Sequence, residues 1–270
     1  MQTTDVGFTG AIPQLYEQLL VPLIFQPYAD DLAARATRLS PRRVLELAGG
    51  TGVATRRLAA RLPAEADIVA TDLNPAMLDE ARRIGSARPV QWRQADAMQL
   101  PFDDACFDLV VCQFGVMFFP DRVVALAEAR RVLRPGGALL LNTWDRIEDN
   151  VFAKVVTEAL ADVFPTDPPR FLARLPHGYH DPVAIRHDIQ AAGFEAVRIE
   201  TLAATSHADG AHQVALAYCA GTPLRNEIEL RNPAGLDRAV EAAEAALARC
   251  FGPGAISGHI QALVVQARAA

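Results

Sequence analysis

Short apolar runs alternate with segments of helical periodicity through the first half of the chain. The runs have the length of buried strands, and the segments between them place apolar residues three and four positions apart. We predict strands at residues 44–47, 67–72, 90–94, 107–113 and 138–142. Strands that alternate with helices form parallel sheets, so the pattern predicts a doubly wound α/β fold.

The segment before the first strand predicts helices. Residues 12–20 and 22–39 show helical spacing, and we expect Pro22 and Pro27 to break the helix or to start a new one. We interpret residues 1–42 as a helical cover that packs on the core.

After Trp144 the alternation loosens. We predict helices at 151–164, 182–192, 207–221 and 236–250, a proline-rich loop at 165–176, and strands at 196–202 and 260–267. The elements between the fifth and sixth strands form an insertion.

Composition places the chain among globular proteins. Of its 270 residues, 51% are hydrophobic and 21% are charged, enough for one large domain or two small ones. The net charge of -6 argues against nucleic acid as a partner. The apolar runs are too short to span a membrane, and no signal-like segment opens the chain. The 4 scattered cysteines predict reduced thiols in a cytoplasmic protein, whose oligomeric state the sequence leaves open.

The first predicted strand runs into a glycine-rich turn, Ala48-Gly49-Gly50-Thr51-Gly52. Glycine lets a ligand approach the backbone, and the first amides of the next helix attract polar or anionic groups. The stretch therefore predicts a nucleotide-type cradle, although a tight connection without a ligand is the alternative. The dinucleotide fingerprint would need glycine or alanine where the chain has Thr55, which weakens that interpretation.

The turn resembles motif I of class I S-adenosylmethionine-dependent methyltransferases, which usually reads D/E-x-G-x-G-x-G. Glu46, Gly50 and Gly52 match it, and Ala48 replaces the first glycine. The resemblance implies S-adenosyl-L-methionine as the cofactor, held by Ala48, Gly49 and Gly50.

The second predicted strand ends on Asp72. A carboxylate there can accept hydrogen bonds from both hydroxyls of a ribose. Alternatively, Asp72 only caps the helix that starts near Pro75. The stretch Asp72-Leu73-Asn74-x-x-Met77 resembles the family's second motif, which implies that Asp72 binds the ribose and that Leu73 and Met77 flank the adenine.

The loop after the third strand is the most discriminating stretch. Residues 95–108 read A-D-A-x-x-L-P-F-D-D-x-x-F-D, which resembles this methyltransferase group. A carboxylate here can accept from the adenine amino group while the next amides donate to a ring nitrogen. We assign these roles to Asp96, Ala97 and Met98, with a plain polar loop as the alternative.

An aromatic-rich segment follows the fourth strand. Gln113, Phe114 and Phe118 border the place where the methyl donor would meet its acceptor, although such a cluster is equally typical of a core. Lids in methyltransferases of this type imply that Tyr16 reaches toward the amino-acid end of the cofactor.

The resemblance covers residues 40–145 firmly and the last strands loosely. It implies a Rossmann-like methyltransferase fold with a mostly parallel sheet of seven strands, the last one antiparallel. We expect a single domain with a lid at 1–42, a cofactor-binding core at 43–144, and substrate covers at 145–193 and 203–257.

The implied reaction is in-line methyl transfer to nitrogen, oxygen or carbon of a small molecule, as in quinone biosynthesis. The alternatives are a dinucleotide-dependent oxidoreductase, a non-catalytic adenosylmethionine-binding protein, and transfer of an alkyl group other than methyl. The oxidoreductase is disfavoured further because the chain has no recognisable Tyr-x-x-x-Lys pair.

The acceptor end is weakly marked. Tyr179 and His180 lie in a turn bounded by glycine and proline, and histidine titrates near neutrality. We predict both as catalytic candidates, with His180 as a base; alternatively, His180 and Asp181 cap the next helix. No metal is expected, because His177, His180 and His187 have no cysteine nearby.

Overall fold

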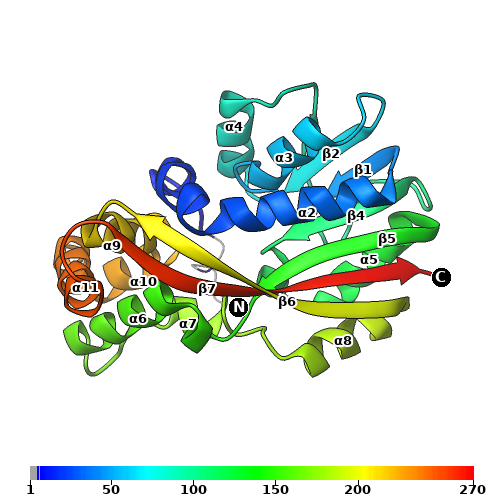
Figure 1. Ribbon diagram of the computed structural model, residues 1–270. Coiled ribbons are helices and arrows are strands. Elements are labelled where there is room, and N and C mark those ends of the chain that lie inside the picture. Colours follow the sequence, from blue (N-terminus) through cyan, green and yellow to red (C-terminus); the bar gives the residue numbers. More distant parts are fainter. Residues whose placement is uncertain (1–4, 6) are drawn as a thin grey trace. The chain divides into compact units, whose positions relative to one another are not determined.

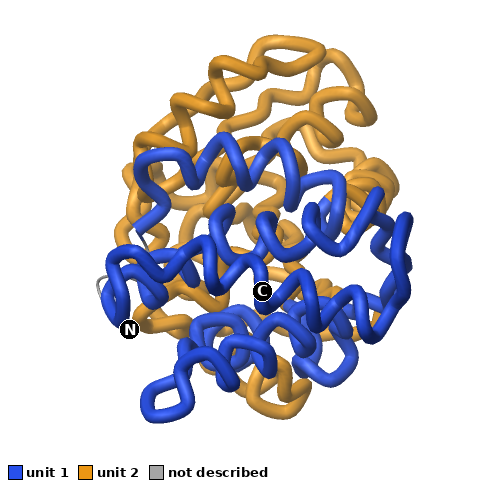
Figure 2. Tube along the Cα trace, turned by 90° about the vertical axis from the view of Figure 1, so that its left-hand side faces the viewer, with its two compact units in different colours: residues 1–25, 144–178, 203–261 blue, residues 26–143, 179–202, 262–270 orange. Residues whose placement is uncertain are grey.

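A computed structural model describes residue 5 and residues 7–270 of the chain. The chain divides into two compact units (Figure 2). Unit 1 comprises residues 1–25, 144–178 and 203–261, and unit 2 comprises residues 26–143, 179–202 and 262–270. The single domain with a lid and two covers stays a prediction.

One sheet of seven strands has the order β3-β2-β1-β4-β5-β7-β6 (Figure 1). The strands are β1 (Arg43–Glu46), β2 (Asp67–Asp72), β3 (Gln91–Gln94), β4 (Phe107–Gln113), β5 (Leu133–Trp144), β6 (Phe194–Ala208) and β7 (Ile256–Ala269). β1 pairs in parallel with β2 and β4, β2 with β3, and β4 with β5. The arrows of β6 and β7 point in opposite directions in Figure 1. The predicted doubly wound, mostly parallel fold is confirmed.

The central strands are buried on both faces, which explains why they read as unbroken apolar runs. Leu109 and Val111 of β4 are fully buried, whereas β3 at the edge of the sheet is mostly exposed. Leu109 also packs with Val44 of β1, Leu32 and Leu58 in one hydrophobic cluster that joins the sheet to two helices. This cluster supports the strand whose end carries the glycine turn.

The helices of unit 2 are α2 (Gln26–Leu39), α3 (Val53–Arg61), α4 (Pro75–Ile84), α5 (Arg122–Val132) and α8 (Pro182–Ala191), with a 3₁₀ turn at Val116–Phe118. Helices α4 and α8 begin where the sequence predicts them. Asn74, Asp121 and Asp181 cap α4, α5 and α8, each side chain accepting a backbone N–H at 2.9–3.0 Å. Satisfying these free amides is the reason that such residues mark helix starts.

The N-terminal helices are not interrupted at their prolines. α1 (Ile12–Leu15), a π-helix (Tyr16–Phe25) and α2 follow one another without a coil residue between them. The predicted break or start at Pro22 is therefore wrong, whereas Pro27 lies where a new helix, α2, starts, as expected. In a π-helix each N–H bonds to the carbonyl five residues earlier, so Pro22 removes one hydrogen bond and its ring does not press on the carbonyl four residues earlier. Pro27 lies in the first turn of α2, where proline is tolerated.

Unit 1 is largely helical. Its helices after β5 are α6 (Val151–Val163), α7 (Phe171–Arg174), α9 (Ala211–Ala220), α10 (Leu224–Arg231) and α11 (Leu236–Phe251), with a 3₁₀ turn at Ile147–Asp149. α11 packs against α9 and α6. The predicted loop at 165–176 contains α7, and α10 was missed because its mainly polar sequence has no clear apolar stripe. β6 continues to Ala208, where a helix was expected from residue 207.

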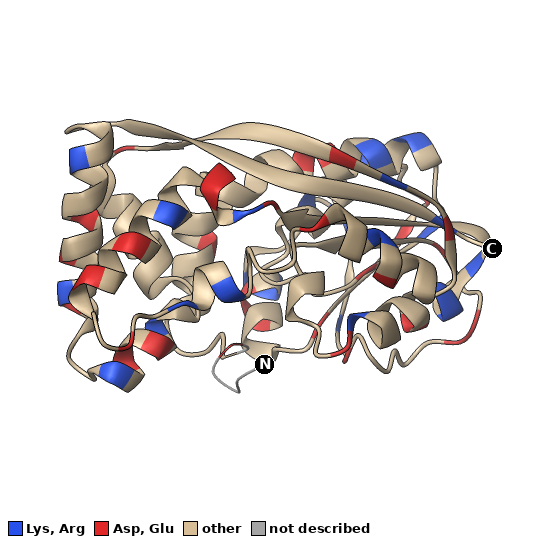
Figure 3. Ribbon diagram, turned by 90° about the horizontal axis from the view of Figure 1, so that it is seen from below, with Lys and Arg blue, Asp and Glu red and all other residues tan. Residues whose placement is uncertain are grey.

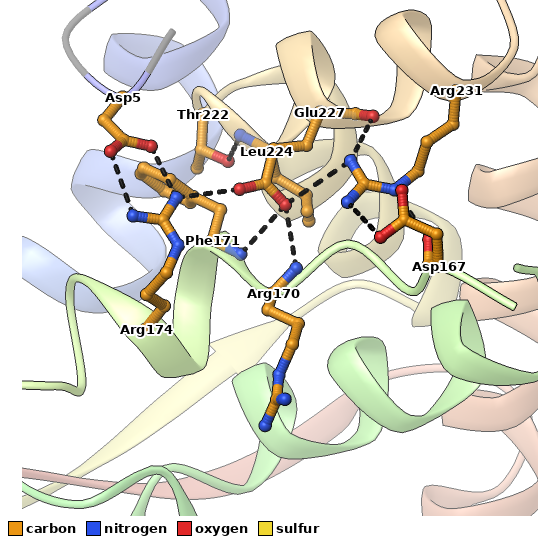
Figure 4. A network of polar contacts seen from close by, with 9 residues as sticks. All are labelled: Asp5, Asp167, Arg170, Phe171, Arg174, Thr222, Leu224, Glu227 and Arg231. Atoms are coloured by element: carbon orange, nitrogen blue, oxygen red, sulfur yellow. Dashed lines mark hydrogen bonds and ion pairs between the residues drawn. The ribbon is translucent and has the colours of Figure 1, made fainter. Parts of the chain in front are cut away.

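An ion-pair network ties the N-terminal segment of unit 1 to two of its helices (Figure 4). Arg174 donates to the buried carboxylate of Asp5 at 2.6 and 2.9 Å and to Glu227 of α10 at 2.8 Å. Glu227 also accepts the backbone N–H groups of Arg170 and Phe171 at 2.8 and 3.2 Å. Charge-assisted bonds therefore hold both ends of the short helix α7.

Acidic and basic residues are interspersed along the helices (Figure 3). Lys154 and Glu158 of α6 pair at 2.9 Å, and Arg225 and Glu229 of α10 pair at 2.7 Å, each one helical turn apart. In the part of the chain that the structure describes, no helix is both long and apolar enough to cross a membrane.

Candidate cofactor site

The glycine turn after β1 adopts backbone angles that favour glycine. Gly50 and Gly52 have φ of +56° and +88°, and Ala48 has φ of +50°. A Cβ on Gly52 would lie 2.7 Å from the ring of Trp92, so this glycine also permits α3 to pack on the strand layer. A Cβ on Gly50 would lie 3.4 Å from Met77 Cε and would fill the space between the turn and the start of α4.

Asp72 links the glycine turn to the loop after β2. Its Oδ2 accepts the Gly50 N–H at 2.8 Å, and its Oδ1 accepts the Asn74 N–H at 2.8 Å. Burial raises the pKa of Asp72, and these backbone hydrogen bonds oppose the rise. The cap of α4 is Asn74, so Asp72 is not the helix cap that the sequence allowed as its alternative.

Glu46 is a buried carboxyl group under the turn. Burial raises its pKa to about 8, the neighbouring charge of Asp72 adds to the rise, and the hydroxyl of Thr55, which donates to Glu46 Oε2, opposes it. Glu46 is therefore largely protonated at neutral pH. The sequence patterns do not predict the pairing of Glu46 with Thr55. Its one sign in the sequence is the threonine that stands where the dinucleotide fingerprint has glycine or alanine.

The residues predicted for the adenine lie on two neighbouring loops of unit 2. Leu73 is 53% exposed and Met77 is buried in α4. Asp96 accepts the Met98 N–H at 2.8 Å, so this amide is already engaged. Ala97 has no hydrogen bond from its N–H to any described residue. Ala97 thus offers the better donor to an adenine ring nitrogen.

The segment after β4 packs directly against the turn. A Cβ on Gly115 would lie 2.5 Å from Ala48 Cβ and 2.8 Å from Cys112 Sγ, a requirement for glycine that the sequence did not reveal. Gln113 and Phe114 are buried and Phe118 is half-buried. These residues and the turn are brought together at the carboxyl ends of β1 and β4.

Tyr16 belongs to unit 1, whereas the other predicted cofactor residues belong to unit 2. Its ring stacks on Phe25 at 4.9 Å and meets Phe8 edge-on at 6.2 Å. Its contact with the cofactor stays a prediction.

Tyr179 and His180 lie just before α8 in unit 2. Tyr179 is buried, its hydroxyl donates to Asp188 at 2.9 Å, and its carbonyl accepts from the Thr143 hydroxyl at 2.8 Å. Burial and the bond to Asp188 raise the pKa of Tyr179. His180 is half-buried, and the cap of α8 is Asp181.

The turn fits the polar end of S-adenosylmethionine. Thr51 Oγ1 is buried and finds no hydrogen-bond partner among the described residues. A buried hydroxyl without a partner costs free energy unless a ligand or water satisfies it. The space that a Gly50 side chain would fill and the unpaired hydroxyl both suit a ligand that crosses this turn.

Comparison with known proteins identifies the family. A model described as "Methyltransferase domain" matches residues 45–141. The demethylmenaquinone methyltransferase of Deinococcus radiodurans is 41% identical over 135 residues, which cover 49% of this chain and 56% of that protein. The protein of the same name from Thermus thermophilus is 36% identical over 178 residues, which cover 62% of this chain and 80% of that protein. The chain belongs to the class I S-adenosylmethionine-dependent methyltransferases.

This methyltransferase-family chain also resembles solved structures over nearly its whole length. A phosphoethanolamine N-methyltransferase of Haemonchus contortus in complex with S-adenosyl-L-methionine matches with a TM-score of 0.61 and 16% identity, over 99% of this chain and 60% of that one. At this identity the match shows the fold alone. The cofactor of the family, S-adenosylmethionine, is the cofactor of this chain.

Proposed function

We propose that the protein transfers the methyl group of S-adenosylmethionine to a small-molecule acceptor. The observation that carries this proposal is Asp72, which joins the glycine turn to the loop after β2 through Gly50 and Asn74, both at 2.8 Å. Each carboxylate oxygen has a second lone pair, so ribose hydroxyls can still donate to it.

Bound S-adenosylmethionine supplies a methyl group that its sulfonium already activates. In our proposal the residues of the chain hold and orient it: Asp72 accepts from the ribose, Ala48 to Gly50 approach the amino-acid end, and Leu73, Met77 and the loop at 96–98 contact the adenine. The protein then has to align the acceptor with the methyl group and exclude water.

On the acceptor side, the contacts favour His180 over Tyr179 as the group that takes a proton. The hydroxyl of Tyr179 is engaged by Asp188, and its raised pKa makes it a poor base at neutral pH. Tyr179 instead supports the turn that carries His180. We propose His180 as the base for acceptors that must lose a proton.

The names of the relatives make a quinone precursor the first acceptor to test. We also propose a cytoplasmic location, which the four free thiols support.

Two measurements test the proposed function. Calorimetry should show binding of S-adenosylmethionine and S-adenosylhomocysteine and no binding of nicotinamide dinucleotides. Incubation with methyl-labelled donor and a quinol library, followed by mass spectrometry, should show a labelled product. Tight cofactor binding without any product would favour a sensor, a product with a different mass gain would favour another alkyl transfer, and absence of cofactor binding would refute the proposal.

A further inference from the structure

The side-chain amide of Asn142 has a defined orientation in β5. Its Oδ1 accepts the backbone N–H of Phe114 at 3.1 Å, and the Asn142 carbonyl accepts the same N–H at 3.1 Å. Because an N–H group cannot donate to an amide NH₂, this contact assigns the oxygen to the Phe114 side. The Nδ2 group therefore points away from Phe114.

This contact holds a strained residue. Phe114 has φ of +51°, a left-handed conformation that is unfavourable for a side chain of this size. Phe114 opens the segment that packs Gly115 against Ala48 of the glycine turn. Asn142 thus helps to position the rim of the cofactor site.

The Nδ2 group of Asn142 is buried and has no hydrogen-bond acceptor among the residues that the structure describes. Asn142 itself is fully buried. The hydroxyl of the neighbouring Thr143, by contrast, does have a partner, because it donates to the Tyr179 carbonyl at 2.8 Å. Buried donors in proteins are almost always satisfied, so we expect a ligand or a water to accept from this group.

The place of Asn142 in the sheet indicates which group that is. Ligands of such sheets bind at the carboxyl ends of the strands, and Asn142 lies near that end of β5, in register with Gln113. In the sheet, β4 lies next to β1 and β5 lies on the far side of β4. Asn142 is therefore one strand further than Gln113 from the glycine turn after β1, where we place the cofactor. The donor therefore belongs to the side of the site where the acceptor enters.

We propose that Asn142 Nδ2 donates a hydrogen bond to an oxygen of the acceptor molecule, an inference that rests on the proposed methyl transfer. The group recognised is a phenolic, enolic or carboxylate oxygen, because an ammonium group has no lone pair to accept from Nδ2. Asn142 then has two roles: its oxygen positions Phe114, and its NH₂ group selects acceptors that carry an oxygen.

The test uses three probes on one aromatic ring, chosen because Asn142 contacts the aromatic residue Phe114. They are 1-naphthol, 1-naphthoate and 1-naphthylmethylamine, titrated into the full chain saturated with S-adenosylhomocysteine. We expect the wild type to bind both oxygen probes at least tenfold more tightly than the amine. Asn142→Asp keeps the oxygen that faces Phe114 and loses the N–H donors. It should weaken naphthoate binding at least tenfold and strengthen binding of the amine, a reversal that a purely structural role would not produce.

Asn142→Leu is the second variant, and thermal melting checks that both variants fold. It should lose the preference between probes, because leucine has no N–H donor. An unchanged probe preference in the folded variants would mean that a buried water satisfies Nδ2, and it would overturn the proposal. Failure of the wild type to bind either oxygen probe would overturn it as well. Failure of the wild type to bind S-adenosylhomocysteine would instead refute the proposed function.

Discussion

Glu46 is expected to make the protein less stable as the pH rises through neutrality. Burial raises its pKa from 4.5 to about 8 in the folded protein, whereas the unfolded chain has the ordinary value. Between these two values the folded protein keeps a proton that the unfolded chain has lost. The unfolded state therefore binds fewer protons, and the free energy of unfolding falls with increasing pH.

The magnitude follows from the size of this pKa difference. The stabilisation is complete below the pKa that Glu46 has in the unfolded chain, and it is lost as the pH rises through the pKa that Glu46 has in the folded protein. At roughly 1.4 kcal/mol per pKa unit, linkage gives a loss of about 3 kcal/mol between pH 5 and pH 8. Asp72, whose pKa burial also raises, contributes with the same sign.

Urea denaturation at several pH values, without cofactor, measures this effect. Glu46→Gln replaces the neutral carboxyl by a neutral amide of the same shape, so its curve should be flatter than that of the wild type. Between pH 5 and pH 8, the free energy of unfolding of the variant should rise by about 3 kcal/mol relative to that of the wild type. Glu128→Gln is the matched control: the hydrogen bonds from Arg131 lower the pKa of Glu128, so its stabilisation is lost only at acid pH. Parallel curves for Glu46→Gln and the wild type would refute the argument.

Four further predictions concern the two units. Asp72→Ala should weaken S-adenosylmethionine binding by about 1.5–3 kcal/mol, roughly tenfold to over a hundredfold, because a charged acceptor is lost; calorimetry with unchanged affinity would contradict this. Gly115→Ala should destabilise the fold by about 1–3 kcal/mol, since the new methyl would overlap Ala48, and a melting temperature equal to that of the wild type would disprove the clash. Arg174→Met should cost about 3 kcal/mol in urea denaturation, near the lower end for a broken buried pair because Arg174 is 34% exposed; a loss below about 1 kcal/mol would show that the network is unimportant. His180→Ala should lower turnover on the true acceptor at least tenfold and leave cofactor affinity unchanged, whereas normal turnover would remove His180 from the catalytic residues.

Local sequence patterns determined the layers of this protein. An apolar run buried on both faces is specified by its own residues, so β2 and β4 lie at the predicted positions. Caps act within one turn, so Asp181 marks the start of α8, which the sequence predicts at residue 182. The resemblance of the glycine turn to motif I of the methyltransferases likewise implied the cofactor.

Contacts between distant segments were decided only by tertiary structure. Glu46 at the end of β1 and Thr55 in the first turn of α3 pair under the glycine turn, and burial there raises a pKa that no local pattern reports. Asn142 reaches Phe114 across 28 positions of the chain, because β4 and β5 lie side by side. Sequence periodicity records which face of an element is buried, but the partner that meets each buried group depends on how the elements pack.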